Sequence, residues 1–218
     1  MSYEISPSTL KMITDKRFGC QRCFWLKVIK GVRPPEPVGL GKLHHEIHNW
    51  QYEYFRSHPT PILLPGPLVS TELTVKATEL NGIILWGILD GLIELSSGGY
   101  AIVDMKTTSS PNYAIANYSL QLNAYAYCLT HAQPGYPSYD IQRLGVLTFT
   151  GHRFGINHAE SAGIVGKLMW HEVTPSEISL IMALRQAETI LGGPCPNPRI
   201  ECEWCQFYES IRGEKWNQ

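Results

Sequence analysis

Two short stretches indicate the fold: Gly87-Ile88-Leu89-Asp90-Gly91 and, after a turn, Tyr100-Ala101-Ile102-Val103-Asp104-Met105-Lys106. Both pieces are apolar runs of strand length, and Ser96-Ser97-Gly98-Gly99 between them is typical of a turn. We therefore expect a hairpin. Side chains alternate between the two faces of a strand, so Asp104 and Lys106 are expected to share one face.

The ends of these strands carry charges that a buried strand seldom holds. If the hairpin forms, Asp90 lies beside Asp104, and two carboxylates share the end of an apolar sheet with Lys106. Burying these groups is costly unless a divalent cation sits between them. For an isolated D-x-K, a solvated hairpin end with a surface ion pair is the simpler interpretation. Here the D-x-K closes an apolar strand, follows a Gly-x-x-Asp-Gly turn and precedes Thr107-Thr108.

This pattern resembles the core of the PD-(D/E)XK nuclease superfamily in its RecB-like branch, where G-x-x-D precedes a strand that ends D-x-K-T. The resemblance covers about residues 2–208. It implies an α/β fold, with a restriction-endonuclease-like core in which helices flank a central mixed sheet. It also implies metal-dependent hydrolysis of DNA, with Asp90, Asp104 and Lys106 as catalytic residues. Lys106 would orient or help deprotonate the attacking water and stabilise charge in the transition state.

A histidine supplies the third expected metal ligand. His45 lies four residues after Gly41, and this spacing is similar to the G-x-x-x-H helix of RecB-like nucleases, so His45, Asp90 and Asp104 would hold Mg²⁺ or Mn²⁺. An imidazole with two carboxylates suits these ions and leaves positions for water and a phosphate oxygen. His44 and His48 are rivals for this role, because the same helical turn can present either. A surface histidine without a ligand role is the alternative.

The helix expected after the D-x-K strand carries Gln121 and Tyr125. Residues four apart share a helix face, and the pair resembles the Q-x-x-x-Y element of the RecB-like branch in its order and distance from D-x-K. The resemblance implies that both side chains hold the DNA backbone or orient a base or the attacking water. Taken alone, this pair occurs often by chance.

Cysteines gather near both ends of the chain. Cys20-x-x-Cys23 and Cys202-x-x-Cys205 are chelate units for zinc or iron–sulfur. Similar pairs of ends are tied by a four-iron cluster in CRISPR-associated exonucleases and in helicase–nuclease subunits, which use one N-terminal and three C-terminal cysteines. Here the final C-terminal cysteine is absent. The resemblance favours a 4Fe-4S cluster, zinc is the alternative, and Cys195 is an alternative ligand.

These observations give the expected domain organisation. We expect one nuclease domain over residues 1–218, in which 1–38 and 192–218 form a cysteine–metal lobe. The net charge of −1 does not indicate a nucleic-acid binder, but residues 1–42 hold eight basic side chains against three acidic ones. Arg17, Arg22 and Lys27 are therefore expected to contact phosphates. A helix with a solvated basic face is the alternative.

The remaining elements follow from periodicity and turn signals. Ser6 should cap a helix that reaches Phe18, and residues 39–55 and 117–131 should be helical. Asn81-Gly82 indicates a hairpin between strands at 69–77 and 83–89. We expect a further strand at 141–150, and a helix over 175–191 capped by Thr174. The polar stretch after Thr150 gives no clear signal.

The function expected from these residues is a Mg²⁺- or Mn²⁺-dependent deoxyribonuclease, acting as an exonuclease on single-stranded or end-exposed DNA. Its partners would be DNA and, as the resemblance implies, a helicase or other repair or CRISPR proteins. No apolar run is long enough to span a membrane, and no secretory signal is present, so a cytoplasmic protein is expected. A catalytically idle nucleic-acid-binding module and a structural zinc or iron–sulfur adaptor are the alternatives.

Overall fold

The computed structural model describes residues 2–15, 19–33, 40–58, 63–108, 111–158 and 161–212. Within these ranges it leaves out the side chains of 40–45, 111–114, 116, 156–158, 161–162 and 211–212. Across the described ranges, no helix has the length and apolar character that crossing a membrane requires.

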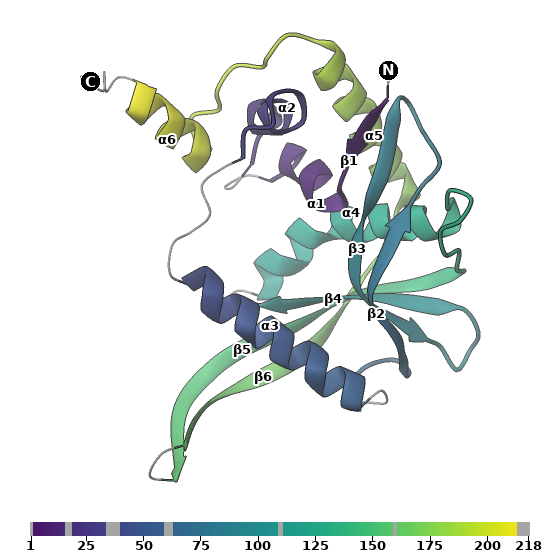
Figure 1. Ribbon diagram of the computed structural model, residues 1–218, viewed down its shortest axis with the longest axis vertical. Coiled ribbons are helices and arrows are strands. Elements are labelled where there is room, and N and C mark those ends of the chain that lie inside the picture. The colour runs from purple at the N-terminus through teal and green to yellow at the C-terminus, as the bar shows by residue number, and fades with distance from the viewer. Residues whose placement is uncertain are drawn as a thin grey trace.

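Helices and short connections alternate with six strands (Figure 1). In chain order the elements are β1 (Tyr3–Ile5), α1 (Pro7–Leu10), the 3-10 helix η1 (Lys11–Ile13), α2 (Gln21–Lys30), α3 (Leu40–Ser57), β2 (Leu68–Lys76), β3 (Ile83–Glu94), β4 (Tyr100–Thr107), α4 (Pro111–Thr130), β5 (Ile141–His158), β6 (Ser161–Val173), α5 (Glu177–Gly192) and α6 (Glu203–Arg212).

The strands form one mixed sheet in the order β1-β3-β4-β5-β6, with β2 also paired to β3. The β1–β3 and β4–β5 pairs are parallel, and the β2–β3, β3–β4 and β5–β6 pairs are antiparallel. A central mixed sheet flanked by helices is the expected α/β architecture, which the structure confirms.

The sheet separates two hydrophobic cores. On one face Ile102 of β4 packs in a core with Leu122 and Cys128 of α4. On the other face Val103 and Met105 of β4 pack in a core that includes residues of α3. This alternation along β4 explains its continuous apolar sequence, because a central strand covered on both faces has no solvent side. It also fixes the side of the sheet toward which Asp104 points.

The turns around β3 match their sequence signals. Asn81 and Gly82 both have positive φ (52° and 69°), and the backbones of Leu80 and Ile83 exchange two hydrogen bonds around them. This is the tight two-residue turn that Asn-Gly favours. The hairpin between β3 and β4 is likewise confirmed, with Gly91 paired to Val103 and Glu94 to Tyr100.

Several boundaries differ from the expected ones. Ser6 caps its helix as expected, accepting from Thr9 N, but η1 ends at Ile13. The cap of α5 is Ser176 and not Thr174, because the Ser176 hydroxyl accepts from Ser179 N. Four elements had no expected secondary structure: the helices α2 and α6, β1, which is only three residues long, and β6, which continues the β5 hairpin through the stretch that gave no signal.

Candidate active site and cysteine cluster

The position of Asp90 follows from how β3 changes partners. From Gly91 onward β3 pairs with β4, whereas its first residues, Ile83–Leu85, pair with β1. Asp90 therefore lies where the β3–β4 ladder ends. Its Oδ2 accepts a hydrogen bond of 2.8 Å from the Met105 backbone N–H. The carboxylate thus continues, through a side chain, the link between two strands that are beginning to diverge.

Asp104 projects from β4 toward α4 and is almost fully buried, with 2% exposed. Its Oδ1 accepts from Gln121 Nε2 at 3.2 Å. Lys106 Nζ lies 2.9 Å from Oδ2 and 3.4 Å from Asp90 Oδ2, so a single ammonium contacts both carboxylates. The three residues that the sequence groups on paired strand ends therefore lie together in the fold.

The two carboxyl groups have different acidities. Burial opposes ionisation of Asp90, but Lys106, His48 and the Met105 N–H outweigh it and hold its pKa at about 2. For Asp104, burial is the largest influence, the Asp90 charge adds to it, and the pKa rises to about 6. Burial also opposes the charge on Lys106, yet Asp104 and Asp90 raise its pKa above the usual lysine value. Lys106 therefore keeps its positive charge, and as the pH falls Asp104 is protonated before Asp90.

The histidine that reaches this site is His48. Its Nε2 lies 3.3 Å from Asp90 Oδ2, and its ring packs edge-on against Tyr52 at 4.5 Å between centroids. His45 occupies the preceding turn of α3, but its side chain lies outside those that the structure describes, as does that of His44. The ligand role expected for His45 stays a prediction, and His48 is the histidine whose contact with the Asp90 carboxylate is visible.

Gln121 and Tyr125 lie one helical turn apart on α4, and both are buried. Gln121 contacts Asp104, as described above, and the Tyr125 hydroxyl donates to the Ile88 carbonyl at 2.8 Å. Both side chains therefore connect α4 to β4 and β3. A contact of either with DNA stays a prediction.

The donor set can be compared with what Mg²⁺ or Mn²⁺ requires. Two carboxylates and an imidazole are suitable ligands for these ions. Asp104 Oδ2 is buried and receives no well-aligned hydrogen bond from the described residues, although Lys106 is close. Among these residues, only the four cysteines bring three or more ligand atoms within 4.8 Å of one another. The chemistry of the carboxylate site therefore fits such a cation, although its ligand atoms lie farther apart than the four cysteine sulfurs.

The second candidate centre is formed by Cys20, Cys23, Cys202 and Cys205, all buried. Their sulfurs lie close together: Cys20 is 3.5 Å from Cys23 and 3.4 Å from Cys205, and Cys23 is 3.7 Å from both Cys202 and Cys205. These separations exceed a disulfide bond. Cys195 is exposed and bonds to the Pro196 carbonyl, outside this group.

Each CxxC pair begins a helix. Cys20 is the N-cap of α2, and Cys202 immediately precedes α6, so Cys23 and Cys205 lie in the first turns. Helix N-termini favour thiolates. The Cys23 thiol hydrogen-bonds to Cys20 and, against the opposing effect of burial, lowers the pKa of Cys20 to about 4. Burial raises the pKa of Cys205 to about 11. A thiolate among three further thiols is suited to a metal cation.

The α2 and α6 helices, called the cysteine lobe below, are joined by other contacts. Arg22 of α2 lies 3.5 Å from Glu209 of α6, and Tyr208 of α6 donates to the Arg33 carbonyl after α2. Arg22, expected to contact DNA, thus has an ion pair inside the lobe. Lys27 is half-buried beside α6, and Arg17 lies outside the described residues.

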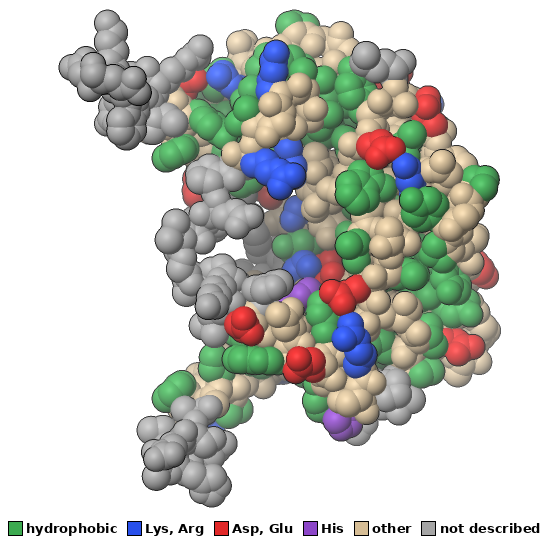
Figure 2. Space-filling model, viewed as in Figure 1, with side chains coloured by type: hydrophobic (Ala, Val, Ile, Leu, Met, Phe, Trp, Pro, Cys, Tyr) green, Lys and Arg blue, Asp and Glu red, His purple; other side chains and the backbone are tan. Residues whose placement is uncertain are grey.

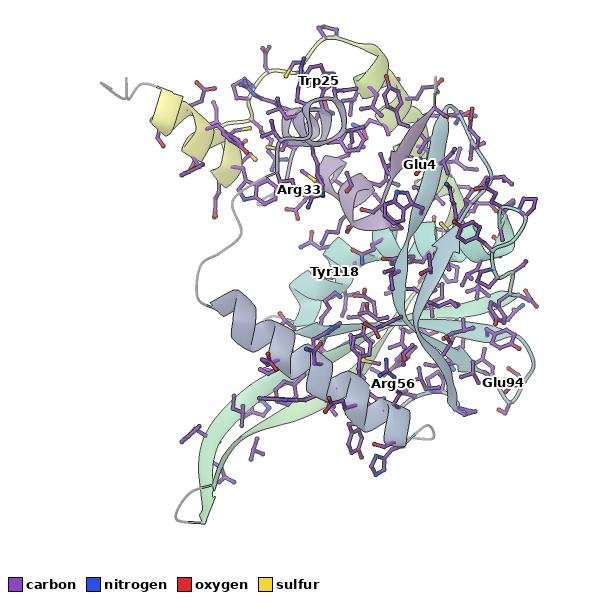
Figure 3. The ribbon with its side chains drawn as sticks, in the orientation of Figure 1. Glu4, Trp25, Arg33, Arg56, Glu94 and Tyr118 are labelled. Atoms are coloured by element: carbon purple, nitrogen blue, oxygen red, sulfur yellow. The ribbon has the colours of Figure 1, made fainter. Side chains whose placement is uncertain are left out.

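Two residues near the site carried no expected role. Lys11 of η1 lies 3.9 Å above the Tyr118 ring of α4, and Lys106 lies 4.9 Å from the same ring. In Figure 3, Tyr118 lies below Trp25 of α2 and below Arg33, which follows α2. No local pattern identifies Lys11, because the lysine belongs to a short helix whose place against α4 is set by packing.

Comparisons with known proteins agree with this geometry. The family model of the PD-(D/E)XK nuclease superfamily matches residues 65–210. The crystal structure of a protein named SSO0001 is similar in fold, with a TM-score of 0.56 and 15% identity over 96% of this chain and 85% of that one. No curated protein sequence matches the chain.

Proposed function

Because the chain belongs to the PD-(D/E)XK nuclease superfamily, we propose that it hydrolyses phosphodiester bonds in DNA, with Asp90, Asp104 and Lys106 as its catalytic residues. The observation that carries this proposal is the shared ammonium of Lys106, which lies within 3.4 Å of an oxygen of each aspartate where β3 and β4 diverge. A buried pair of carboxylates with a fixed cation is costly for folding alone, so its position at the end of the sheet favours a catalytic use.

The chain's own residues would act as follows. A Mg²⁺ or Mn²⁺ ion held by Asp90, Asp104 and a histidine of α3 would polarise the scissile phosphate and lower the pKa of a bound water. Lys106 remains protonated because both aspartates raise its pKa, so it is suited to stabilise negative charge on the phosphate and to orient water. Gln121 holds Oδ1 of Asp104, which leaves Oδ2 for the cation.

The preferred substrate would be single-stranded or end-exposed DNA, as the resemblance to RecB-like exonucleases implies. The direct test is digestion of end-labelled DNA in linear and circular, single- and double-stranded forms, with Mn²⁺ and with EDTA. We expect Mn²⁺-dependent loss of label from linear strands and survival of circles. Tight binding to DNA without cleavage under any metal would instead indicate an idle nucleic-acid-binding module.

For the cysteine cluster we propose a structural metal. Four tetrahedral ligands at the usual Zn–S distance of about 2.3 Å lie about 3.8 Å apart, close to the observed 3.4–3.7 Å. In a four-iron cluster each cysteine binds a different iron, so the sulfurs stand farther apart around it. The spacing therefore favours a single ion such as Zn²⁺, whereas the resemblance favours 4Fe-4S. Iron, sulfide and zinc analysis after anaerobic purification decides between them.

A further inference from the structure

A cavity of about 390 Å³ opens beside the carboxylate site and has no role in the function proposed above. Its walls come from five elements: Ser8 from α1, Lys11 from η1, Lys27 from α2, Asn117 and Tyr118 from α4, and Trp204 from α6. We call this cavity the lysine pocket. Figure 2 shows Lys and Arg side chains gathered along the hollow between the cysteine lobe, at the top of the view, and the sheet.

The lysine pocket contains two cationic donors and one buried amide donor. Two ammonium groups, from Lys11 and Lys27, share its wall with the Asn117 amide. The Nδ2 atom of Asn117 is buried and has no hydrogen-bond partner among the described residues. A buried donor without a partner costs about 1–3 kcal/mol, so an acceptor supplied by a ligand would relieve this cost.

Charge in the pocket supports the same conclusion. Burial lowers the pKa of Lys11, whereas Asp15 and Asp104 favour its ammonium form. Burial and then Arg33 lower the pKa of Lys27. Each lysine is thus a partly desolvated cation whose charged form an anion would stabilise. Asp15 also lines the pocket, and its carboxylate would oppose an anion bound on its own side.

The pocket adjoins the catalytic residues directly. The Tyr118 ring contacts Lys11 at 3.9 Å and Lys106 at 4.9 Å, measured from each Nζ to the ring centroid. One aromatic ring therefore separates the pocket from the ammonium that contacts both aspartates. An anion bound in the pocket while a phosphodiester is at Asp90 and Asp104 is close enough to belong to the same strand.

The cysteine lobe builds half of the pocket. Lys27 lies one helical turn after Cys23 on α2, and Trp204 lies between Cys202 and Cys205 on α6. The cluster that holds these two helices together therefore also fixes a cation and a half-buried indole beside the active site. Indole faces stack on nucleic-acid bases without regard to sequence.

From these contacts we infer that the lysine pocket binds a non-scissile phosphate of the substrate strand, with Lys11, Lys27 and Asn117 as donors and Trp204 as a stacking surface. The inference rests on the proposed function, which it extends by a second phosphate site. It also gives the cysteine cluster a role in substrate binding, because the cluster positions Lys27 and Trp204.

The test compares two lysines of one helix. Lys27→Met removes a pocket cation, and Lys30→Met removes an equal charge from the exposed end of α2, where Lys30 lies 5.9 Å from the Trp25 ring. Both changes are made in an Asp104→Asn background, so that single strands are bound and not cut. We expect Lys27→Met to weaken binding about five- to tenfold and to reduce the salt slope by about 0.7, as for one lost phosphate contact. Lys30→Met should do neither.

Further arms separate the possible outcomes. Asn117→Leu, which changes no charge, should also weaken binding. Metal content should match the parent in every variant, and no variant should melt at a lower temperature than the parent. Comparing 5′-phosphate with 5′-hydroxyl strands shows whether the bound group is a terminal or an internal phosphate. Equal affinities and salt slopes for Lys27→Met and Lys30→Met would overturn the pocket.

A separate experiment distinguishes failure of the nuclease proposal from failure of the lysine pocket. If the unmodified protein neither binds nor cuts nucleic acid, the nuclease proposal fails, and the pocket is then probed with inorganic phosphate by ³¹P NMR. Line broadening that Lys27→Met and Asn117→Leu abolish would support an anion site. No broadening, or equal broadening in all variants, would refute it.

Discussion

Lys106 forms an ion pair of 2.9 Å with Asp104 inside the protein, and the same ammonium lies 3.4 Å from Asp90. The lysine therefore compensates two carboxylates that could not both remain ionised without a cation. This arrangement places one positive charge against both carboxyl groups at the end of the sheet. The consequences can be measured for each residue.

Replacing Asp104 or Lys106 by Ala should abolish cleavage. Losing a metal ligand, or the charge that stabilises the transition state, is expected to cost about 3–4 kcal/mol of barrier, or two to three orders of magnitude in rate. Single-turnover cleavage of labelled DNA measures the effect, and circular dichroism checks the fold. Lys167→Ala, at an exposed position of β6, is the control and should cut normally. Parental rates in either site variant would refute the catalytic assignment.

Asp104→Asn should stabilise the metal-free protein at neutral pH. The folded-state pKa of Asp104 is raised to about 6 from 3.8, chiefly by burial. Between these values the folded state holds a proton that the unfolded state releases, so this group lowers stability as the pH rises. Removing the charge should add about 1–3 kcal/mol to the free energy of unfolding at pH 8.

Denaturant unfolding in EDTA at pH 8 and pH 4.5 measures this difference. At pH 4.5 Asp104 is mostly protonated in the folded state but still largely ionised in the unfolded state, so the gain should fall to about one third of its value at pH 8. Asp90 behaves in the opposite way: its pKa is held at about 2, so its contribution is present above pH 4 and is lost as the pH falls through 2. A gain that is the same at both pH values would contradict the assignment of the titrating group.

His48→Ala should raise the Mn²⁺ concentration needed for half-maximal activity about tenfold, because His48 Nε2 lies 3.3 Å from Asp90. His45→Ala tests the role implied by the resemblance and should be measured in parallel. His58→Ala, in an exposed position just after α3 where the ring stacks on Tyr54, is the control. A normal Mn²⁺ requirement for His48→Ala would assign any histidine ligand elsewhere on α3.

Gln121→Leu should lower the cleavage rate about tenfold with little change in DNA affinity. The Gln121 amide holds Asp104 Oδ1 at 3.2 Å from a buried position on α4. Gln142→Leu, at an exposed site on β5, gives the matched control. If Gln121→Leu instead weakens DNA binding at an unchanged cleavage rate, the glutamine contacts the strand directly, as the resemblance implies.

Cys202→Ser should lower metal content and melting temperature together, because the free energy of metal binding becomes folding free energy when the ligands come from distant segments. Cys195→Ser is the matched control, since Cys195 is exposed and outside the cluster. It should change neither quantity. Full metal content in the Cys202 variant, with an unchanged melting temperature, would remove the proposal of a structural metal.

Much of the sheet could be predicted from local sequence. The Asn81-Gly82 turn and the apolar run of β4 each act over a few residues, where turn chemistry and alternation of side chains are sufficient. Those signals failed for β1 and β6. A three-residue strand shows no periodicity, and β6 is stabilised by its pairing with β5 across a polar stretch.

The proposed site residues divide in the same way. Asp90, Asp104 and Lys106 stand on strands whose pairing the sequence predicts, so their proximity was expected. The sequence left three histidines of α3 as possible neighbours of the carboxylates. The contact of His48 with Asp90 depends on how α3 packs on the sheet, which local sequence does not specify. No local pattern placed Lys11 and Asn117 in one pocket, because their shared position depends on how η1 and α4 pack.

The sequence by itself determined the hairpin, the acidic strand ends and the two CxxC pairs, because these depend on neighbouring residues. The tertiary structure alone decided which groups meet: Cys20 and Cys205 are in contact although 185 positions separate them, and the lysine pocket draws its walls from both ends of the chain. The physical reason is that burial of apolar surface brings distant segments together, and it depends on the shape of the whole core and not on any one segment.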